Sequence, residues 1–233
     1  MPESQEKAKQ NAAIAGAAMV LHGMTVGLGS GTTAELLVAE LGRRVRHYGL
    51  MITAVSTSER TSDLAKLAGI QIVDPAEIKT LDIVIDGADE IDPQFRMIKG
   101  RGGALLREKI VAAAGHKRVI LVDQTKPVLQ LGTRHHLPVE IAAFGQHWTL
   151  SQLHKIVQKV TLRTLPNGMP FITDGGNRIA DLHTGPIPNP ESLHATLLAI
   201  PGVYETGLFI DLCDVLIVAN STNVQISNRP KPA

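Results

Sequence analysis

Two carboxylates and a lysine follow an apolar segment in a pattern that could do chemistry. Asp86 and Asp89 come directly after the apolar run 81–85, and Lys99 opens a glycine-rich turn further on. Open α/β sheets present reactive groups at the carboxyl ends of buried strands, followed by glycine turns. Acids that serve only solubility usually scatter along helix faces. We therefore interpret this cluster as an active site.

Glu108 adds a candidate general base on the helix expected after that turn. Its helical spacing places it on one face with apolar residues at positions 104, 105, 111 and 112, and a carboxylate in that setting suits proton transfer. The alternative is a solvated residue within the charged triplet 107–109, which helix geometry alone favours. Paired acids can also bind a hard cation, but such sites need several converging oxygens. No helical His or Cys pair supports a metal, so we predict none.

A second glycine turn, residues 27–33, lies between an expected strand and helix and carries the hydroxyls of Ser30, Thr32 and Thr33 around Gly31. Glycines let the backbone approach an anion, and a helix N-terminus supplies N–H groups. With the hydroxyl-rich turn 56–58, this suggests a phosphate cradle. An ordinary capped turn is one alternative. A dinucleotide site is another, but it wants an acid after the second strand, where this chain has hydroxyls.

Composition excludes several classes of protein. The net charge is +1 and only 3% of residues are aromatic, so we expect no nucleic-acid partner and no anionic membrane surface. No apolar run approaches the ~20 residues that span a bilayer. The polar N-terminus indicates no signal peptide, so we expect a cytoplasmic protein. The single cysteine, Cys213, allows no internal disulfide and lies in an apolar segment typical of a core thiol.

The first half of the chain alternates apolar strands with helices, which predicts a parallel, doubly wound sheet. We expect helices at 4–22, 34–45, 59–67 and 103–114, and strands at 24–29, 51–55, 70–73, 81–85 and 118–122.

After about residue 132 the pattern changes. We expect strands at 138–141, 171–173, 178–182 and 203–210, helices at 149–160 and 190–200, and a return to the first sheet at 214–219. The middle strands form a hairpin around Asn177, Trp148 packs in this part, and residues 228–233 are a loose tail. The order resembles a ferredoxin-like unit. The predicted fold is α/β: a doubly wound, mostly parallel Rossmann-like sheet (1–131 plus 208–233, the catalytic domain) with a second, smaller ferredoxin-like α+β subdomain (132–207).

Eight blocks of sequence together resemble one enzyme family. They are VGLGSGTTA (26–34), AVSTS (54–58), DGADEID (86–92), KGRGGALLREKI (99–110), DQTKPV (123–128), LPVEI (137–141), TDGGNRIAD (173–181) and IPGVYETGLF (200–209). In this order they are similar to ribose-5-phosphate isomerase, type A, over nearly the whole chain.

The resemblance implies an aldose–ketose isomerase of the non-oxidative pentose phosphate pathway, acting through an enediolate with no cofactor or metal. Glu108 matches the base that moves a proton between C2 and C1, and Asp86, Asp89 and Lys99 match groups that handle the sugar hydroxyls, ring opening and enediolate charge. The positions that match substrate contacts are Ser30, Gly31, Thr32, Thr33, Asp86, Gly87, Ala88, Asp89, Lys99, Gly100, Arg101, Gly102 and Lys126. The family suggests a homodimer or homotetramer. A non-catalytic sugar-phosphate-binding regulator on the same fold is the alternative.

Three features depart from the family pattern or leave a choice open. Arg101 interrupts a run that usually reads Lys-Gly-Gly-Gly, and a positive φ there would cost roughly 1–2 kcal/mol. Otherwise its side chain points outward or adds a phosphate contact. The turn 174–177 reads Asp-Gly-Gly-Asn where Asp-Asn-Gly-Asn is common. A family lysine that contacts substrate corresponds to either Lys7 or Lys9.

Overall fold

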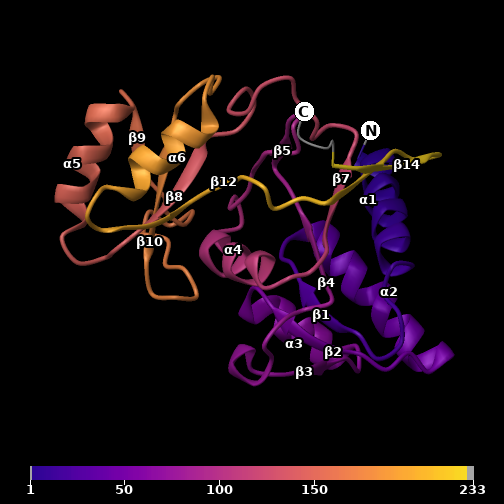
Figure 1. The fold of residues 1–233 in the computed structure, drawn as a ribbon. Helices are drawn as coiled ribbons and strands as arrows, with labels where there is room; N and C mark the ends of the chain where they lie inside the picture. The colour runs from indigo at the N-terminus through magenta and orange to yellow at the C-terminus, as the bar shows by residue number, and fades with distance from the viewer. Residues whose placement is uncertain (1, 230–233) are drawn as a thin grey trace. The chain divides into compact units, whose positions relative to one another are not determined.

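The computed structural model describes residues 2–229, which divide into two compact units (Figure 1). Unit 1 comprises Met1–Ala88, Arg107–Lys126 and Asp211–Ala233, and unit 2 comprises Asp89–Leu106 and Pro127–Ile210. Each is described by itself below. The domain bounds expected from sequence remain a prediction. In the structure, residues 89–106 group with unit 2.

Unit 1 contains a seven-stranded sheet with the order β14-β13-β7-β4-β1-β2-β3. The strands are β1 (Thr25–Leu28), β2 (Thr53–Ser56), β3 (Gln71–Ile72), β4 (Ile83–Gly87), β7 (Arg118–Asp123), β13 (Val215–Ala219) and β14 (Val224–Asn228). All neighbours are parallel except β13 and β14. From β1 the chain adds strands in one direction, and from β4 in the other. The adjacent ends of β1 and β4 are therefore the switch point at which such sheets bind ligands.

Helices cover both faces of this sheet, which confirms the doubly wound prediction. One buried cluster joins Leu28 and Ile85 of the sheet to α1 (Pro2–Ala17), α2 (Thr32–Tyr48) and α3 (Glu59–Leu67). A separate cluster packs Val111 of α4 (Leu105–Ala113) against Val84. A short 3₁₀ helix, η1 (Pro75–Glu77), precedes β4.

The first helix is shorter than its sequence predicts. It ends at Ala17 instead of residue 22. Arg44 of α2 donates to the carbonyls of Ala17 and Val20, so a side chain from the neighbouring helix satisfies the helix end.

Unit 2 is the predicted ferredoxin-like subdomain. Its antiparallel sheet has the order β11-β8-β10-β9, with β8 (Leu137–Ile141), β9 (Val160–Leu162), β10 (Arg178–Leu182) and β11 (Val203–Thr206). Val139 packs with Leu153 of α5 (Gln146–Ile156) and Leu197 of α6 (Pro190–Leu198), so both helices cover one face. Alternate strand residues, including Pro138 and Asp181, lie on the opposite face. A small sheet of β5 (Glu90–Ile91), β6 (Met97–Ile98) and β12 (Leu208–Phe209) completes the unit.

Several element predictions in this half were wrong. The strand beside β10 is β9, which we did not expect, because the predicted helix 149–160 ran up to its first residue. Residues 171–173 form no strand. Thr173 is used to close the turn to β10, since its hydroxyl donates to Glu140 at 2.9 Å and its N–H to the Asn177 carbonyl. The expected strand 203–210 breaks at Gly207 into β11 and β12, which belong to different sheets.

Three side-chain and chain-end expectations can also be compared with the structure. Trp148 is 65% exposed, so the expectation that it packs was wrong. Asn228 ends β14, which we did not anticipate, and residues 230–233 lie outside the described residues. Cys213 is buried, as predicted, and burial raises the pKa of its thiol to about 12.

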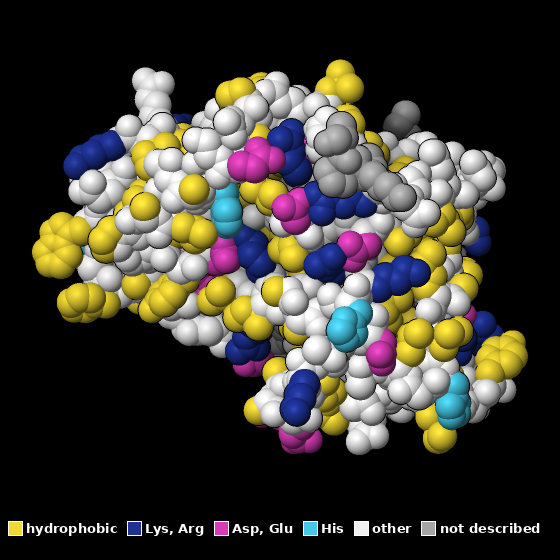
Figure 2. Space-filling model, in the orientation of Figure 1, with side chains coloured by type: hydrophobic (Ala, Val, Ile, Leu, Met, Phe, Trp, Pro, Cys, Tyr) yellow, Lys and Arg dark blue, Asp and Glu magenta, His cyan; other side chains and the backbone are white. Residues whose placement is uncertain are grey.

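Basic and acidic side chains intermingle on the face seen in Figure 2, in keeping with the near-zero net charge. Within residues 2–229, the helices are too short or too polar for any of them to cross a bilayer.

Candidate active site

In unit 1, the candidate residues gather at the switch point of the parallel sheet. β1 leads into the turn 29–33, and the neighbouring β4 places Asp86 near its end. Asp86 is buried, and its Oδ1 accepts hydrogen bonds from the N–H groups of Ser30 at 3.1 Å and Gly87 at 2.7 Å. The two strand ends are therefore joined through the Asp86 carboxylate.

This junction requires a glycine at position 29. A Cβ there would lie 1.9 Å from Asp86 Oδ1, a distance no real contact allows. Gly31 has φ 87° and precedes α2, whose first turn receives no side-chain cap in the described structure. The N–H groups at the start of α2 are thus not capped by a side chain, which is the usual arrangement at an anion site.

Glu108 lies in the same unit and is only 5% exposed. The Ser30 hydroxyl donates to Glu108 Oε1. The solvated alternative for this residue was therefore wrong, because the exposed side of the helix belongs to residues such as Ile110. Ser30 links both acids: its N–H binds Asp86 and its hydroxyl binds Glu108.

The contacts of the two candidate lysines near the N-terminus distinguish them. Lys9 Nζ donates to the Thr32 hydroxyl at 3.0 Å, whereas Lys7 Nζ lies 3.5 Å from the side-chain oxygen of Gln10. Lys9 is therefore the lysine that α1 places against the glycine turn.

Lys126 follows an ordered turn at the end of β7. Its N–H donates to the carbonyl of Asp123, whose buried carboxylate accepts from the Thr125 N–H at 2.8 Å and from the Thr125 hydroxyl. Burial acts to raise the pKa of Asp123. The Thr125 and Gln5 hydrogen bonds and the Lys126 charge outweigh it, so the pKa is lowered.

The second hydroxyl-rich turn, residues 56–58, serves local structure. Ser58 caps α3 by accepting from the Thr61 N–H at 3.1 Å, and the Ser56 hydroxyl donates to the Ser58 carbonyl. The capped-turn alternative fits this segment.

Unit 2 carries the remaining candidates. Lys99 is buried, its N–H donates to the Gly207 carbonyl at 2.9 Å, and its Nζ lies 5.3 Å from the centre of the Phe209 ring. Asp89 Oδ2 accepts from the Arg101 N–H at 3.0 Å. The structure thus joins Asp89 to the turn that begins at Lys99.

Arg101 carries no backbone strain. Of the described residues other than glycine, only Phe95 and Asp211 have a positive φ. The positive φ values of the turn belong to Gly100 and Gly103, so the strain considered for Arg101 does not arise. Its exposed side chain lines a cavity instead.

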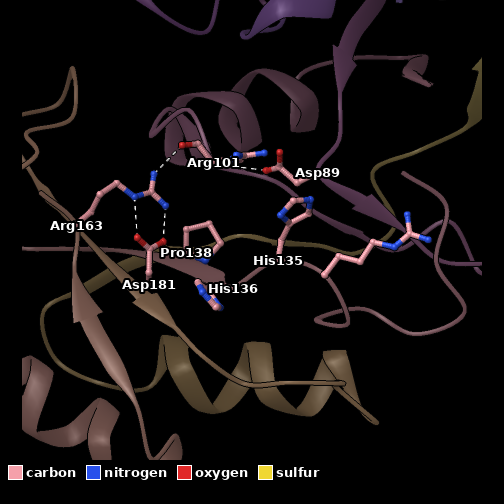
Figure 3. Close-up of a pocket in the computed structure, with 8 residues that line it drawn as sticks. Asp89, Arg101, His135, His136, Pro138, Arg163 and Asp181 are labelled. Carbon is pink, nitrogen blue, oxygen red and sulfur yellow. Dashed lines mark hydrogen bonds and ion pairs between the residues drawn. The ribbon is translucent and has the colours of Figure 1, made fainter. Parts of the chain in front are cut away.

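That cavity has a volume of about 350 Å³ (Figure 3). It is lined by Asp89, Arg101, Arg134, His135, His136, Pro138, Arg163 and Asp181. Buried Glu90 fixes one wall by accepting from the N–H groups of Gly132, Arg134 and His135, each at 2.6 Å. Among these lining residues, the sequence assigned a role only to Asp89 and Arg101. Pro138 and Asp181 lie in blocks that resemble the family but received no role, and the other four lie outside those blocks.

Two further findings complete the description of the site. In residues 2–229, no three or more His, Cys, Asp or Glu side chains gather in a way that could hold a metal ion. Hydrogen bonds join Ser30 to Asp86 and Glu108 within unit 1. Within unit 2, a hydrogen bond joins Asp89 to Arg101, in the turn that begins at Lys99.

Comparison with known proteins gives consistent matches. The family model of Ribose 5-phosphate isomerase A (phosphoriboisomerase A) matches residues 53–223. Ribose-5-phosphate isomerase A from Thermomicrobium roseum is 44% identical over 97% of this chain and 95% of its own. The enzyme of the same name from Thermoplasma acidophilum is 48% identical over 88% of this chain and 84% of its own.

Solved structures agree. Ribose 5-phosphate isomerase A from Methanocaldococcus jannaschii has a TM-score of 0.89 at 33% identity, over 94% of this chain and 97% of its own. A D-ribose-5-phosphate isomerase in complex with phospho-erythronic acid has a TM-score of 0.91 at 33% identity, over 97% of this chain and 99% of its own. This chain therefore belongs to the ribose 5-phosphate isomerase A family.

Proposed function

We propose that the protein interconverts D-ribose 5-phosphate and D-ribulose 5-phosphate through an enediolate, in the non-oxidative pentose phosphate pathway. Family membership supports this reaction. The observation that carries the proposal is the buried Glu108 carboxylate, which is hydrogen-bonded by the hydroxyl of a glycine turn at the switch point. Such a carboxylate is a base held in one orientation.

The reaction needs a base that removes a proton from C2 and returns it to C1. We assign this step to Glu108. A positioned general base contributes a factor on the order of 10²–10⁴ to the rate. Because Ser30 holds one Glu108 oxygen, the carboxylate has little freedom to turn away from the substrate carbons.

The enediolate carries negative charge that must be stabilised as it develops. We assign this task to Lys99, and the sugar hydroxyls and ring opening to Asp86 and Asp89. A preorganised donor at a developing oxyanion is worth a few kcal/mol of barrier. The Lys99 main chain is held by its N–H bond to the Gly207 carbonyl, and its Nζ lies over the Phe209 ring, which favours a cation there.

The substrate phosphate is assigned to the turn at the start of α2. Ser30, Gly31, Thr32 and Thr33 supply hydroxyls and helix N-terminal N–H groups there, and Lys9 and Lys126 supply positive charge. Binding energy at the phosphate, remote from the reacting carbons, can hold those carbons in register. The further substrate-binding positions are Gly87, Ala88, Gly100, Arg101 and Gly102.

The proposal also covers the location, assembly, cofactor requirement and domain bounds of the enzyme. We propose a cytoplasmic homodimer or homotetramer that needs no cofactor, with a catalytic domain of residues 1–131 and 208–233 and a subdomain of residues 132–207. The non-catalytic regulator is not favoured, since the chain carries all four residues assigned to turnover: Asp86, Asp89, Lys99 and Glu108.

The test is ribulose 5-phosphate formation from ribose 5-phosphate by purified protein in excess chelator. We expect chelator-resistant turnover that falls about 10²–10⁴-fold in Glu108→Gln. Glu77→Gln, which changes an exposed glutamate in η1, is the matched control and should keep parental activity.

Calorimetric titration with ribose 5-phosphate separates the enzyme from the regulator. Binding without turnover in the parent protein would overturn the isomerase and favour the regulator. Turnover abolished by chelator would overturn the proposed independence from metal.

A further inference from the structure

Arg163, which no sequence motif singled out, links the glycine turn 99–103 to the body of unit 2. It follows β9 directly, and its guanidinium forms a two-pronged ion pair with Asp181 of β10: Nε donates to Oδ2 at 2.9 Å and Nη2 donates to Oδ1. The remaining terminal nitrogen, Nη1, donates to the Gly100 carbonyl at 3.0 Å. It also donates to the Arg101 carbonyl at 2.9 Å (Figure 3).

The turn that receives these bonds also has hydrogen bonds of its own. The Gly103 N–H donates to the Gly100 carbonyl at 2.9 Å, and the Arg101 N–H donates to Asp89. Gly100 and Gly103 both have positive φ, a conformation that glycine adopts without favouring it over others. A turn built this way is not rigid by backbone preference, so external hydrogen bonds must select its conformation.

Arg163 is suited to this task because its planar fork leaves one side for a second partner. Both oxygens of Asp181 fix the guanidinium plane, and the free edge then points at two consecutive carbonyls. A lysine offers a single point charge and cannot satisfy the carboxylate and both carbonyls in this geometry. The Phe171 ring, 5.9 Å from the Arg163 guanidinium, lies against Gly103, where a Cβ would come within 2.4 Å of the ring.

We propose that Arg163 and Asp181 are positioning residues that hold the turn 99–103, and with it Lys99, in the conformation the reaction requires. The inference rests on the proposed isomerase function. Lys99 is the first residue of the braced turn, and its charge must meet an oxyanion that exists only in the transition state. A displacement of about 1 Å in such a group can cost about 100-fold in rate. The Arg163–Asp181 pair, called the brace below, therefore affects kcat more than substrate binding.

A purely structural role is the competing explanation, because Arg163 and Asp181 also join β9 to β10. Arg118 provides the matched control. It forms the same kind of fork with Asp214, at 2.7 and 2.6 Å, and this pair joins the start of β7 to the residue before β13 in unit 1 instead of holding a glycine turn.

The experiment compares Arg163→Lys with Arg118→Lys for kcat, KM, thermal unfolding and backbone hydrogen exchange over residues 99–103. For Arg163→Lys we expect kcat to fall about 10- to 100-fold. KM should change less than about threefold, the pattern of a lost transition-state interaction. Exchange in the turn should speed up. Arg118→Lys should lower the unfolding temperature while leaving kcat and turn exchange at parental values.

Chemical rescue adds a readout that general loss of stability would not produce. Methylguanidinium should restore part of the kcat lost in Arg163→Ala and should leave the kcat of Arg118→Ala unchanged. A kcat of Arg163→Lys within about twofold of the parent would overturn the proposal. An absence of turnover in the parent would instead be a failure of the proposed function. In that case unchanged turn exchange in Arg163→Lys would still overturn the brace, because exchange needs no substrate.

Discussion

The two glycine turns of this chain are held in place in different ways. The turn 29–33 of unit 1 is fixed by its neighbours in the sheet: the Gly29 N–H donates to the Ile85 carbonyl at 2.9 Å, and the Ser30 N–H donates to Asp86 on the adjacent strand. The turn 99–103 of unit 2 is fixed by side chains from distant parts of the sequence, above all Arg163.

This difference indicates which substitutions can disturb each turn. The first depends on the backbone of the neighbouring parallel strand and on the Asp86 carboxylate at the end of that strand, so its sensitive positions are the turn itself and Asp86. The second can be disrupted by a substitution far away in the sequence. Both deliver charged groups that the proposed reaction needs at fixed positions.

Adding one methyl group to each turn should show the contrast. Gly29→Ala places a Cβ 1.9 Å from Asp86 Oδ1, so Asp86 or the turn must move, and we expect kcat to fall about 100-fold or more. Gly103→Ala meets the Phe171 ring at 2.4 Å and keeps a positive φ of 84°, but the ring can shift. We expect a smaller loss, about tenfold, with a stability cost of about 1–2 kcal/mol.

Steady-state kinetics and urea unfolding measure both effects. Gly175→Ala is the control, because its added Cβ would have no neighbour closer than 3.4 Å and its φ is not positive. It should lie within about 0.5 kcal/mol of the parent. Equal losses in Gly29→Ala and Gly103→Ala would contradict the distinction between the turns.

Ser30→Ala tests the link between the first turn and the base. The substitution keeps the N–H that binds Asp86 and removes the hydroxyl that binds Glu108. We expect a loss of about 10- to 100-fold in kcat, which corresponds to the ~1.5–3 kcal/mol that hydrogen bonds to charged groups contribute. The loss should be far smaller in Glu108→Gln/Ser30→Ala than the product of the two single effects. Strictly additive losses in that double variant would show that Ser30 does not act through Glu108.

The parallel sheet and its strand-end acids could be predicted because they depend on local pattern. Apolar runs such as 81–85 mark buried strands, and parallel strands bring their carboxyl ends to one edge. The burial of Glu108 could not be derived from helix spacing, because its triplet 107–109 is charged throughout. Which of these residues faces inward depends on what α4 packs against.

The wrong predictions share a cause in tertiary structure. Residues 171–173 have the β-branched and aromatic character of a strand, but the position beside β10 is occupied by β9. Arg163 lies outside the blocks that resemble the family, and Asp181 ends one of them without an assigned role, since a contact between a turn and residues so far along the chain leaves no periodic signal. Arg101 has no backbone strain because the positive φ values of its turn belong to Gly100 and Gly103. The sequence alone does not reveal which residues of the turn take a positive φ.

Asp123 offers the mildest test, on stability instead of rate. Its carboxylate orders the turn before Lys126, and its pKa is lowered in the folded protein by the Thr125 and Gln5 bonds, which outweigh burial. A lowered folded pKa stabilises the fold above the unfolded value of about 3.9, and this contribution is lost as the pH falls through the folded pKa. We expect Asp123→Asn to reduce the free energy of unfolding by about 1 kcal/mol at pH 7. The difference from the parent should shrink below about pH 4. Urea unfolding at several pH values measures it, with Asp63→Asn, a substitution on the helix α3, as the control. A difference that stayed constant with pH would show that the Asp123 charge does not stabilise unit 1.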